Sequence, residues 1–391
     1  MDGDPAVEPE LDSFSLTLPL PYRVALIIDV PTLIRYTRTS GSLPPHHFSI
    51  YRLATILTIS LASSLLLFWA FTHRSPTLVV AYDWLPISYL FLLAIFFFLP
   101  WQRLSQNGRY RFLSTLKRVS IGGIATAKDG KFGDILLADV LTSYAKVLGD
   151  LFVSLCMFFS SGGSATRKPN RNCGGQFIVP FIIAVPSLIR LRQCLIEYGR
   201  ARHEYGRIGL SSGSGWGGQH LANAAKYASA FPVIILSALQ RSLSFDEASV
   251  GMSAAAVYRL WLAAVLLNSL YSFYWDVARD WDLTLFSSAR TDPDHPWGLR
   301  RRMYFQSNEV YYLAIALDLV LRCTWSLKLS PHLDHFNDLE GGIFAMEFLE
   351  VLRRWVWIFF RVETEWVRHA STGLDPDDIL LGDYQGKDDD E

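Results

Sequence analysis

The chain has 391 residues, of which 50% are hydrophobic and 19% are charged, with a formal net charge of -1 and a mean hydropathy of +0.20. Soluble domains carry about a quarter charged residues, so this composition excludes an ordinary soluble protein. The near-neutral charge gives no indication of nucleic-acid binding, which needs a basic surface. Twelve Trp residues within an aromatic content of 14% are typical of the aromatic belts at membrane surfaces.

Apolar segments recur along the chain, and a helix that spans a membrane needs ~20 mostly apolar residues. In chain order, the clear candidates are 50–71, 78–101, 134–159, 176–197, 220–240, 252–275, 305–329 and 341–361. The segment 17–36 is weaker because Asp29 and Pro31 interrupt it, and 109–127 is amphipathic and basic. We therefore predict an all-α fold, a polytopic transmembrane bundle of about eight to ten spanning helices.

These segments divide the chain into four parts. We expect a disordered acidic tail at 1–16, N-terminal membrane helices at 17–127, a larger transmembrane domain at 128–365 and a second disordered acidic tail at 366–391. The first tail lacks the basic start of a cleaved signal peptide. The Lys/Arg-rich stretches do not fit one simple threading, and we place the N-terminus on the cytosolic side.

The four cysteines, at 156, 173, 194 and 323, lie far apart and form no CxxC pair. Three of them fall in apolar runs, where we expect each to act as a small buried hydrophobe. No grouping of residues has the spacing of a metal site, and no nucleophile-elbow pattern is present. We therefore expect no metal, no cofactor and no enzymatic activity.

Polar residues inside the later apolar segments are the most informative feature. In 134–159, five polar residues recur at a helical spacing of three or four, which places them on one stripe: Asp139, Thr142, Ser143, Lys146 and Asp150. Lys226 lies in 220–240, Asp276 and Asp280 close the next segment, and Asp318 and Arg322 form an i,i+4 pair followed by Trp325. In 341–361, Glu347, Glu350, Arg354 and Arg361 share one side and Arg353 lies beside them.

A charge at the centre of a bilayer costs ~2.5–3.5 kcal/mol on the insertion scale, so ionisable residues there face the bundle interior. Two interpretations account for them. They either line a shared polar cavity, where surplus arginines suit a tetrahedral oxyanion, or they form structural ion pairs that hold the helices together. Arg361 lies near a helix end, where a third interpretation, extension of the side chain to the membrane surface, also applies.

Four stretches, "NAAKYASAF", "WDVARDWDL", "YYLAIALDLVLRCTW" and "LEVLRRWVWIFFRVE", resemble the EXS domain. "LADVLTS" is similar to that family's "ADQLNS" stretch, and the resemblance covers about residues 130–365 well. The family includes phosphate exporters of animals and plants and the yeast ER-retention-defective protein. Its larger members begin with an SPX sensor domain. Only about twenty residues precede the first apolar segment here, so the chain resembles the short Golgi branch.

The resemblance implies a set of phosphate-pathway residues. Carried over by motif, they are Asp139, Thr142, Lys226, Asp280, Arg322, Trp325, Glu350, Arg353 and Arg354. Lys226 and the arginines would contact phosphate, Trp325 would gate the pathway, and Asp280 and Glu350 would orient the cations. Thr142 departs from the family Asn, and its hydroxyl lacks the second donor of an amide.

The expected function is transport of inorganic phosphate across the Golgi membrane from lumen to cytosol, which would support glycosylation and retention of Golgi proteins. The protein would be multi-pass, embedded in lipid and able to cycle through the ER, with its front helices as a dimer face. The alternative is a sorting adaptor without transport activity, which binds tails of Golgi glycosyltransferases or coat proteins. Flux-dead variants that still retain Golgi enzymes would favour this alternative.

Overall fold

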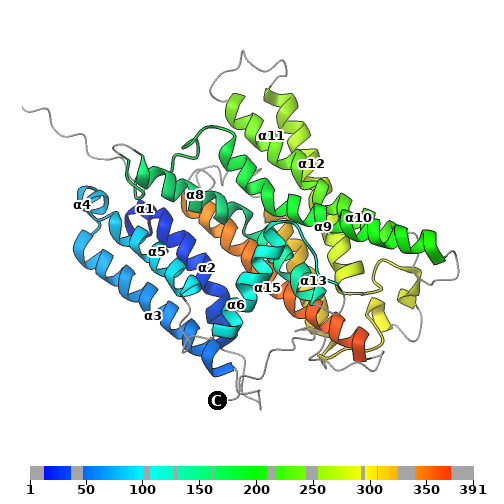
Figure 1. Cartoon of the computed structure of the whole chain (residues 1–391). Coiled ribbons are helices and arrows are strands. Elements are labelled where there is room, and N and C mark those ends of the chain that lie inside the picture. Colours follow the sequence, from blue (N-terminus) through cyan, green and yellow to red (C-terminus); the bar gives the residue numbers. More distant parts are fainter. Residues whose placement is uncertain are drawn as a thin grey trace, which may run out of the picture. The chain divides into compact units, whose positions relative to one another are not determined.

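A computed structural model describes residues 13–36, 47–99, 106–126, 130–160, 163–208, 217–243, 254–291, 296–305, 307–324 and 340–370. All regular secondary structure in these ranges is helical (Figure 1), which confirms the all-α fold class. Most of the two expected acidic tails, and Trp325, lie outside the described residues.

The helices in chain order are α1 (Ser13–Thr17), α2 (Leu20–Tyr36), α3 (His47–Thr72), α4 (Pro76–Ala81), α5 (Trp84–Phe98), α6 (Gln106–Ser120), α7 (Lys131–Ser143), α8 (Ala145–Phe159), α9 (Ile178–Ile208), α10 (Gly218–Ala228), α11 (Ala230–Leu243), α12 (Ala254–Trp275), η3 (Asp276–Asp280), η4 (Ser288–Thr291), η5 (Pro296–Gly298), α13 (Asn308–Arg322) and α15 (Glu340–Ala370).

Five stretches of the described chain are long and apolar enough to cross a membrane, and a sixth is added when α7 and α8 count as one bent span. The five are Arg52–Thr72, Pro76–Phe98, Ile178–Tyr205, Gly218–Arg241 and Ala254–Asp280. The expected number was about eight to ten. The difference lies in helices such as α13, which has only 15 residues, and α15, which is rich in Glu and Arg.

The predicted span 134–159 is broken in the structure. α7 ends at Ser143, and α8 departs from it with a bend of 61°. The Thr142 hydroxyl donates to the Asp139 carbonyl at 2.7 Å, and the Tyr144 N–H lies within reach of the carbonyls of both Leu141 and Val140. Such side-chain and tightened backbone bonds compete with the α-helical ladder and end the helix without a Gly or Pro.

Two other predicted spans also depart from a regular α-helix along their length. Between α10 and α11, Ser229 interrupts the helix three residues before Pro232. Proline cannot donate to the carbonyl of the residue four positions earlier, so the helical ladder is weakened there. After α12, the chain widens into the π-helical turn η3, in which the Trp281 N–H donates to the Asp276 carbonyl at 2.8 Å.

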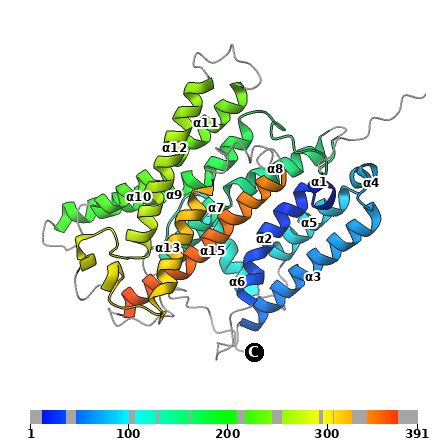
Figure 2. The ribbon, with the colours of Figure 1, turned by 180° about the vertical axis from the view of Figure 1, so that it is seen from behind.

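The chain forms two compact units. The first comprises residues 1–113, 146–182 and 326–351. In it α2, α3 and α5 pack side by side (Figure 1; Figure 2) around the buried rings of Tyr22, Phe68 and Tyr89. The Tyr89 hydroxyl donates to Asp29 at 2.6 Å, which explains how α2 accommodates a buried carboxylate.

The first unit also contains a disulfide between Cys156 and Cys173. The prediction that Cys156 is only a small buried hydrophobe is therefore wrong. Cys156 lies near the end of α8 and Cys173 lies in the connection to α9, so the bond ties this connection to the helix.

The second unit comprises residues 114–145, 183–325 and 352–391. Within it α11 and α12 run side by side (Figure 1; Figure 2). Its apolar core gathers α13, the second half of α15 and the segment that follows α12, with Trp281, Tyr311, Trp357 and Phe360 among its buried residues. Three elements that carry buried charges, η3, α13 and α15, contribute residues to this core.

Candidate functional site

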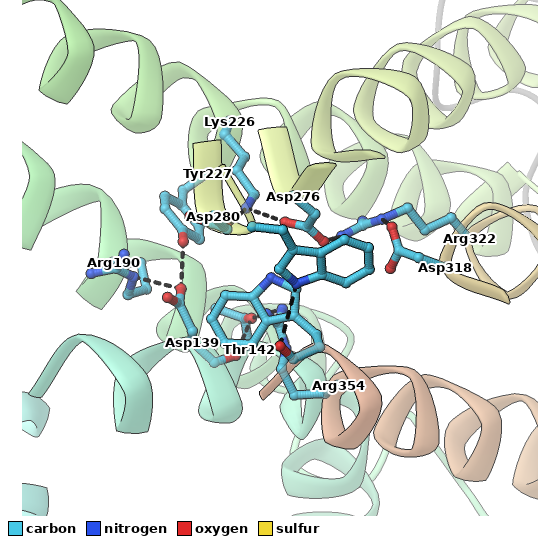
Figure 3. Close-up of polar contacts among 12 residues, drawn as sticks. Asp139, Thr142, Arg190, Lys226, Tyr227, Asp276, Asp280, Asp318, Arg322 and Arg354 are labelled. Atoms are coloured by element: carbon cyan, nitrogen blue, oxygen red, sulfur yellow. Dashed lines mark hydrogen bonds and ion pairs between the residues drawn. The ribbon is translucent and has the colours of Figure 1, made fainter. Parts of the chain in front are cut away.

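A cluster of charged and hydroxyl side chains lies inside the second unit (Figure 3). Its members come from six helical elements: Asp139, Thr142 and Ser143 from α7, Arg190 from α9, Lys226 and Tyr227 from α10, Asp276 and Asp280 from η3, Asp318 and Arg322 from α13, and Arg353 and Arg354 from α15. We call this set the arginine cluster.

Asp276 is the centre of the arginine cluster and has no exposed surface. Its Oδ1 lies 2.8 Å from Lys226 Nζ, and its Oδ2 pairs with Arg322 and lies 3.5 Å from Arg353 Nη1. One carboxylate thus faces three cations from three helices. A buried charge is tolerated only when its partners replace the lost water, which these contacts do.

Two further carboxylates complete the pairing of these cations. Asp318 accepts from Arg322 Nε at 3.0 Å and from Arg353 Nη1 at 3.1 Å. Asp280 lies 3.2 Å from Lys226 Nζ, so the π-helical turn η3 directs both of its acids at the same lysine. π-helical turns are frequent at functional sites, and this one carries both acids at its two ends.

Asp139 forms the other side of the arginine cluster. Arg190 Nε donates to it at 2.7 Å, and the Tyr227 hydroxyl also donates to the same oxygen. The Arg190 guanidinium lies 4.8 Å from the centre of the Tyr227 ring, and Lys226 Nζ lies 5.6 Å from that centre. Tyr227 therefore joins the Asp139 side to the Asp276 side, as Figure 3 shows.

Arg354 differs from the other cations because its bonds go to hydroxyls. Its Nε donates to Ser143 at 2.9 Å and its Nη2 donates to Thr142 at 3.2 Å, while its guanidinium lies 4.6 Å from the centre of the Trp357 ring. Its Nη1 is buried and has no hydrogen-bond partner among the described residues, and the same holds for the indole Nε1 of Trp357. Two buried donors, three residues apart on α15, are thus left without an acceptor.

The charges of the arginine cluster do not balance. It contains five basic residues (Arg190, Lys226, Arg322, Arg353 and Arg354) and four acidic ones (Asp139, Asp276, Asp280 and Asp318). Four of the five cations are paired with carboxylates. The surplus positive charge is that of Arg354, for which the described residues provide no carboxylate within ion-pair distance.

The structure brings together seven of the nine residues that the resemblance assigned: Asp139, Thr142, Lys226, Asp280, Arg322, Arg353 and Arg354. Trp325 lies outside the described residues. Glu350 is half-buried on α15 and belongs to the first unit, as does the exposed Lys146.

Five members of the arginine cluster are absent from the set that the resemblance implied: Ser143, Arg190, Tyr227, Asp276 and Asp318. Helical spacing singled out Asp276 and Asp318, but no motif gave them a role. Arg190 opens one of the Lys/Arg-rich stretches, 190–207, and also interrupts the apolar run 176–197, as Arg353 interrupts the run 341–361. Tyr227 gave no sequence signal, because a tyrosine at the edge of an apolar helix is ordinary.

The described residues contain no group of three or more His, Cys, Asp or Glu side chains placed to hold a metal ion. A hollow of about 210 Å³ lies at the surface beside η3, lined by residues that include Tyr274, Arg279 and Asp282 and by no member of the arginine cluster. The centre of the cluster is buried, since Lys226, Asp276, Asp318, Arg353 and Arg354 are each no more than 6% exposed. The side chains of Asp280 and Arg322 are 17% and 10% exposed.

The fold and the site define a multi-pass helical membrane protein with a buried, net-positive cluster of ion pairs. The sequence model of the EXS family matches residues 15–367. The chain is 32% identical to Protein ERD1 homolog 2 of Schizosaccharomyces pombe over 80% of its length and 75% of that protein. It is 31% identical to Protein ERD1 homolog 1 of the same yeast, over 90% of this chain and 87% of that protein.

More distant relatives are larger. Solute carrier family 53 member 1 of Mus pahari is 27% identical over 83% of this chain but over only 44% of its own length. Because the family match covers most of the sequence, the chain belongs to the EXS family. Its relatives of similar length are the ERD1 homologues, as expected for the short branch.

Proposed function

We propose that this protein moves inorganic phosphate across the Golgi membrane, from the lumen to the cytosol, through the arginine cluster. One observation carries the proposal. Arg354 is buried, has no carboxylate partner among the described residues and presents an Nη1 donor without an acceptor. A guanidinium in this state suits an anion with several acceptor oxygens, because the fork of donors matches phosphate geometry.

The neighbouring donors strengthen this assignment. Trp357 Nε1 is also buried without an acceptor, and it belongs to the ring over which Arg354 lies. An oxyanion beside Arg354 would satisfy both donors and neutralise the surplus charge of the cluster. An unmet buried donor costs about 1–3 kcal/mol, so filling both acts as a driving force for binding.

The remaining pairs explain why such an anion could leave again. Asp276 and Asp318 already neutralise Arg322 and Arg353, so phosphate must compete with carboxylates for these cations. A conduit needs binding strong enough for entry and weak enough for release. Arg322 and Arg353, which are paired with carboxylates, would bind the anion weakly, and Arg354, which has no carboxylate partner, would bind it more strongly.

The comparisons support transport in general terms, since one relative is named as a solute carrier. Phosphate in particular rests on the EXS motifs that carry Lys226, Arg322 and Arg354 and on the chemistry of the free donors. The Golgi location rests on the similarity to the ERD1 homologues.

The disulfide supports an orientation. Disulfides persist in oxidising compartments, so the connection that contains Cys173 would face the lumen. In the same unit Thr166 of this connection donates to Val79, and Trp69 donates to the Thr17 carbonyl. The start of α2 would then also lie on the lumenal side, which replaces the cytosolic placement inferred from the Lys/Arg distribution.

The direction of α9 agrees with this orientation. From the lumenal connection it runs away from the disulfide end and carries Arg200 and Arg202 near its other end. Arginines concentrate at cytosolic ends of spanning helices. Phosphate released by lumenal glycosylation would thus leave toward the side where α9 ends.

Flux measurements in proteoliposomes test the proposal. Arg354→Ala removes the free donor and Arg322→Ala breaks the pairs around Asp276, so each variant should lose most phosphate uptake relative to the wild type. Arg368→Ala is the matched control, because Arg368 lies on the same helix, is exposed and pairs with the exposed Asp282. Phosphate flux that survives in both Arg322→Ala and Arg354→Ala would remove the mechanism.

A further inference from the structure

A second set of buried charges lies in the first unit and shares no residue with the arginine cluster. Arg23 of α2 donates to Glu340 at 2.8 Å. Arg171, in the connection after α8, donates to both oxygens of Glu340 at 3.0 and 3.1 Å and lies 3.6 Å from Asp150 of α8. Glu347 of α15 is within electrostatic range of Asp150, Lys146, Arg171 and Arg23.

This second set has the opposite imbalance. Leaving aside the exposed Lys146, it contains two guanidinium groups and three carboxylates, so one carboxylate has no cation at ion-pair distance when all are ionised. Glu347 is the carboxylate left over. It is only 5% exposed, and no hydrogen bond or ion pair joins it to any other described residue.

The neighbours of Glu347 do not supply the missing charge. Arg171 is occupied by Glu340 and Asp150, and Arg23 is occupied by Glu340, Ser15 and the Leu18 carbonyl. Lys146 is exposed and forms no ion pair with Glu347. The nearby charged residues of α15, Glu340 and Glu350, are acids and cannot neutralise Glu347.

An ionised carboxylate in such surroundings is costly, because it loses most of its hydration and no hydrogen bond or ion pair to a described residue replaces it. A proton on Glu347 removes that cost and also removes the repulsion from Asp150. The proton comes from solvent and returns to it, so no other reactant is needed.

We propose that Glu347 is a proton-binding site and that the closed arrangement of α8 and α15 holds it in the protonated form. Glu347 and Arg354 lie seven residues apart on the same helix, so a movement of α15 that brings water to one changes the surroundings of the other. Phosphate passage at Arg354 is then linked to release of a proton at Glu347. This link rests on the proposed transport function, whereas the proton site does not.

Infrared spectroscopy of the purified protein in nanodiscs tests the proton site directly. The wild type should show the carbonyl band of a protonated carboxylic acid that weakens as the pH is raised, and this component should be missing in Glu347→Gln. Glu309→Gln, at an exposed position on α13, is the control and should keep the band. An identical band in Glu347→Gln and the wild type would overturn the proposal.

Asp29 is a second buried acid, but its contribution is common to all these variants and cancels in the comparison. Glu347→Asp keeps a titratable group and should retain a band at a shifted position. A shifted band in Glu347→Asp, together with its absence in Glu347→Gln, shows that the band belongs to position 347. Unfolding would remove the band from both variants alike.

Phosphate flux in proteoliposomes tests the link. Phosphate itself titrates near neutral pH, so the informative quantity is the ratio of wild-type flux to Glu347→Gln flux at two pH values. Exchange of one proton changes this ratio by up to about tenfold per pH unit. A ratio independent of pH would overturn the link. Absence of wild-type flux would instead overturn the transport function and leave the infrared result standing.

Discussion

At the scale of single residues, Asp276 holds three cations from three helices together. Replacing it by Asn leaves Lys226, Arg322 and Arg353 facing a neutral amide. Removal of one partner from a buried ion pair destabilises by about 3–5 kcal/mol, since the remaining charge is left uncompensated. We expect Asp276→Asn to lower the thermal unfolding temperature in detergent by many degrees.

The exposed Asp282, six residues further along, provides the comparison for that measurement. Asp282→Asn changes charge by the same amount without disturbing a buried pair. Equal unfolding temperatures for the two variants would show that the contacts of Asp276 contribute little to stability.

Thr142 departs from the family motif, and its contacts show what its hydroxyl bonds to. Its hydroxyl accepts from Arg354 and donates to the Asp139 carbonyl, so it has no donor left for an anion. Thr142→Asn restores the family residue and adds amide N–H donors near Arg354. One added hydrogen bond of ~1 kcal/mol should lower the KM for phosphate about fivefold.

The matched change is Thr142→Val, which removes the hydroxyl at similar volume and adds no donor, so it should not lower that KM. Uptake curves of the two variants in proteoliposomes check the expectation. If both shift KM in the same direction, hydrogen bonding at position 142 is not what determines affinity.

The sequence alone predicted some of the residues of the arginine cluster but not their pairing. The cost of charge in lipid predicted that Lys226, Arg322 and the adjacent arginines 353 and 354 face the protein interior, and the structure confirms it. Partner choice was not predictable, since Asp276 lies 50 residues from Lys226 and 46 from Arg322. The expectation that surplus cations face a shared site fits Arg354, whereas the interpretation as structural ion pairs fits Arg190.

At the scale of elements, irregular turns in the helices coincide with the charged residues of the arginine cluster. The bend after Ser143 and the π-helical turn η3 both occur where polar residues enter the arginine cluster. The apolar pattern predicted continuous helices there because hydropathy reports length and composition, not the hydrogen bonds of single turns. Helix existence was therefore predictable, and helix breaks were not.

The disulfide gives a prediction at this scale. It closes a connection with a sequence separation of 17, for which the loop-entropy estimate is about 3 kcal/mol. Reductant should lower the unfolding temperature of the wild type. It should have no effect on the Cys156→Ser/Cys173→Ser double variant, which already lacks the bond.

Arg171 lies two residues before Cys173, so the disulfide restrains the segment whose guanidinium contacts Glu340 and Asp150. An unfolding temperature of the wild type that is insensitive to reductant would contradict a stabilising bond. The comparison uses thermal unfolding in detergent followed by Trp fluorescence.

At the scale of the whole molecule, the proposed orientation is testable because the chain has no natural Asn-x-Ser/Thr acceptor. An Asn-Gly-Ser acceptor inserted between Lys168 and Pro169 should be glycosylated in cells, since this connection carries the disulfide. The same insertion between Ser287 and Ser288 follows three further candidate spans and should stay unmodified.

A reversed pattern of modification on electrophoretic mobility would reverse the orientation and with it the direction of phosphate movement. The arginine cluster itself would be unaffected, because its contacts lie within the second unit. Orientation and binding chemistry are therefore separable questions.

The sequence by itself determined that this protein is helical, lies in a membrane and belongs to the EXS family, because hydropathy and short motifs are local properties of the chain. It also determined that charges inside apolar helices must meet, since lipid cannot solvate them. Only the tertiary structure decided which carboxylate neutralises which cation. It left Arg354, whose hydroxyl partner Ser143 lies 211 residues away, with the unpaired charge. Such partners are set by how distant segments pack, and no local pattern encodes that.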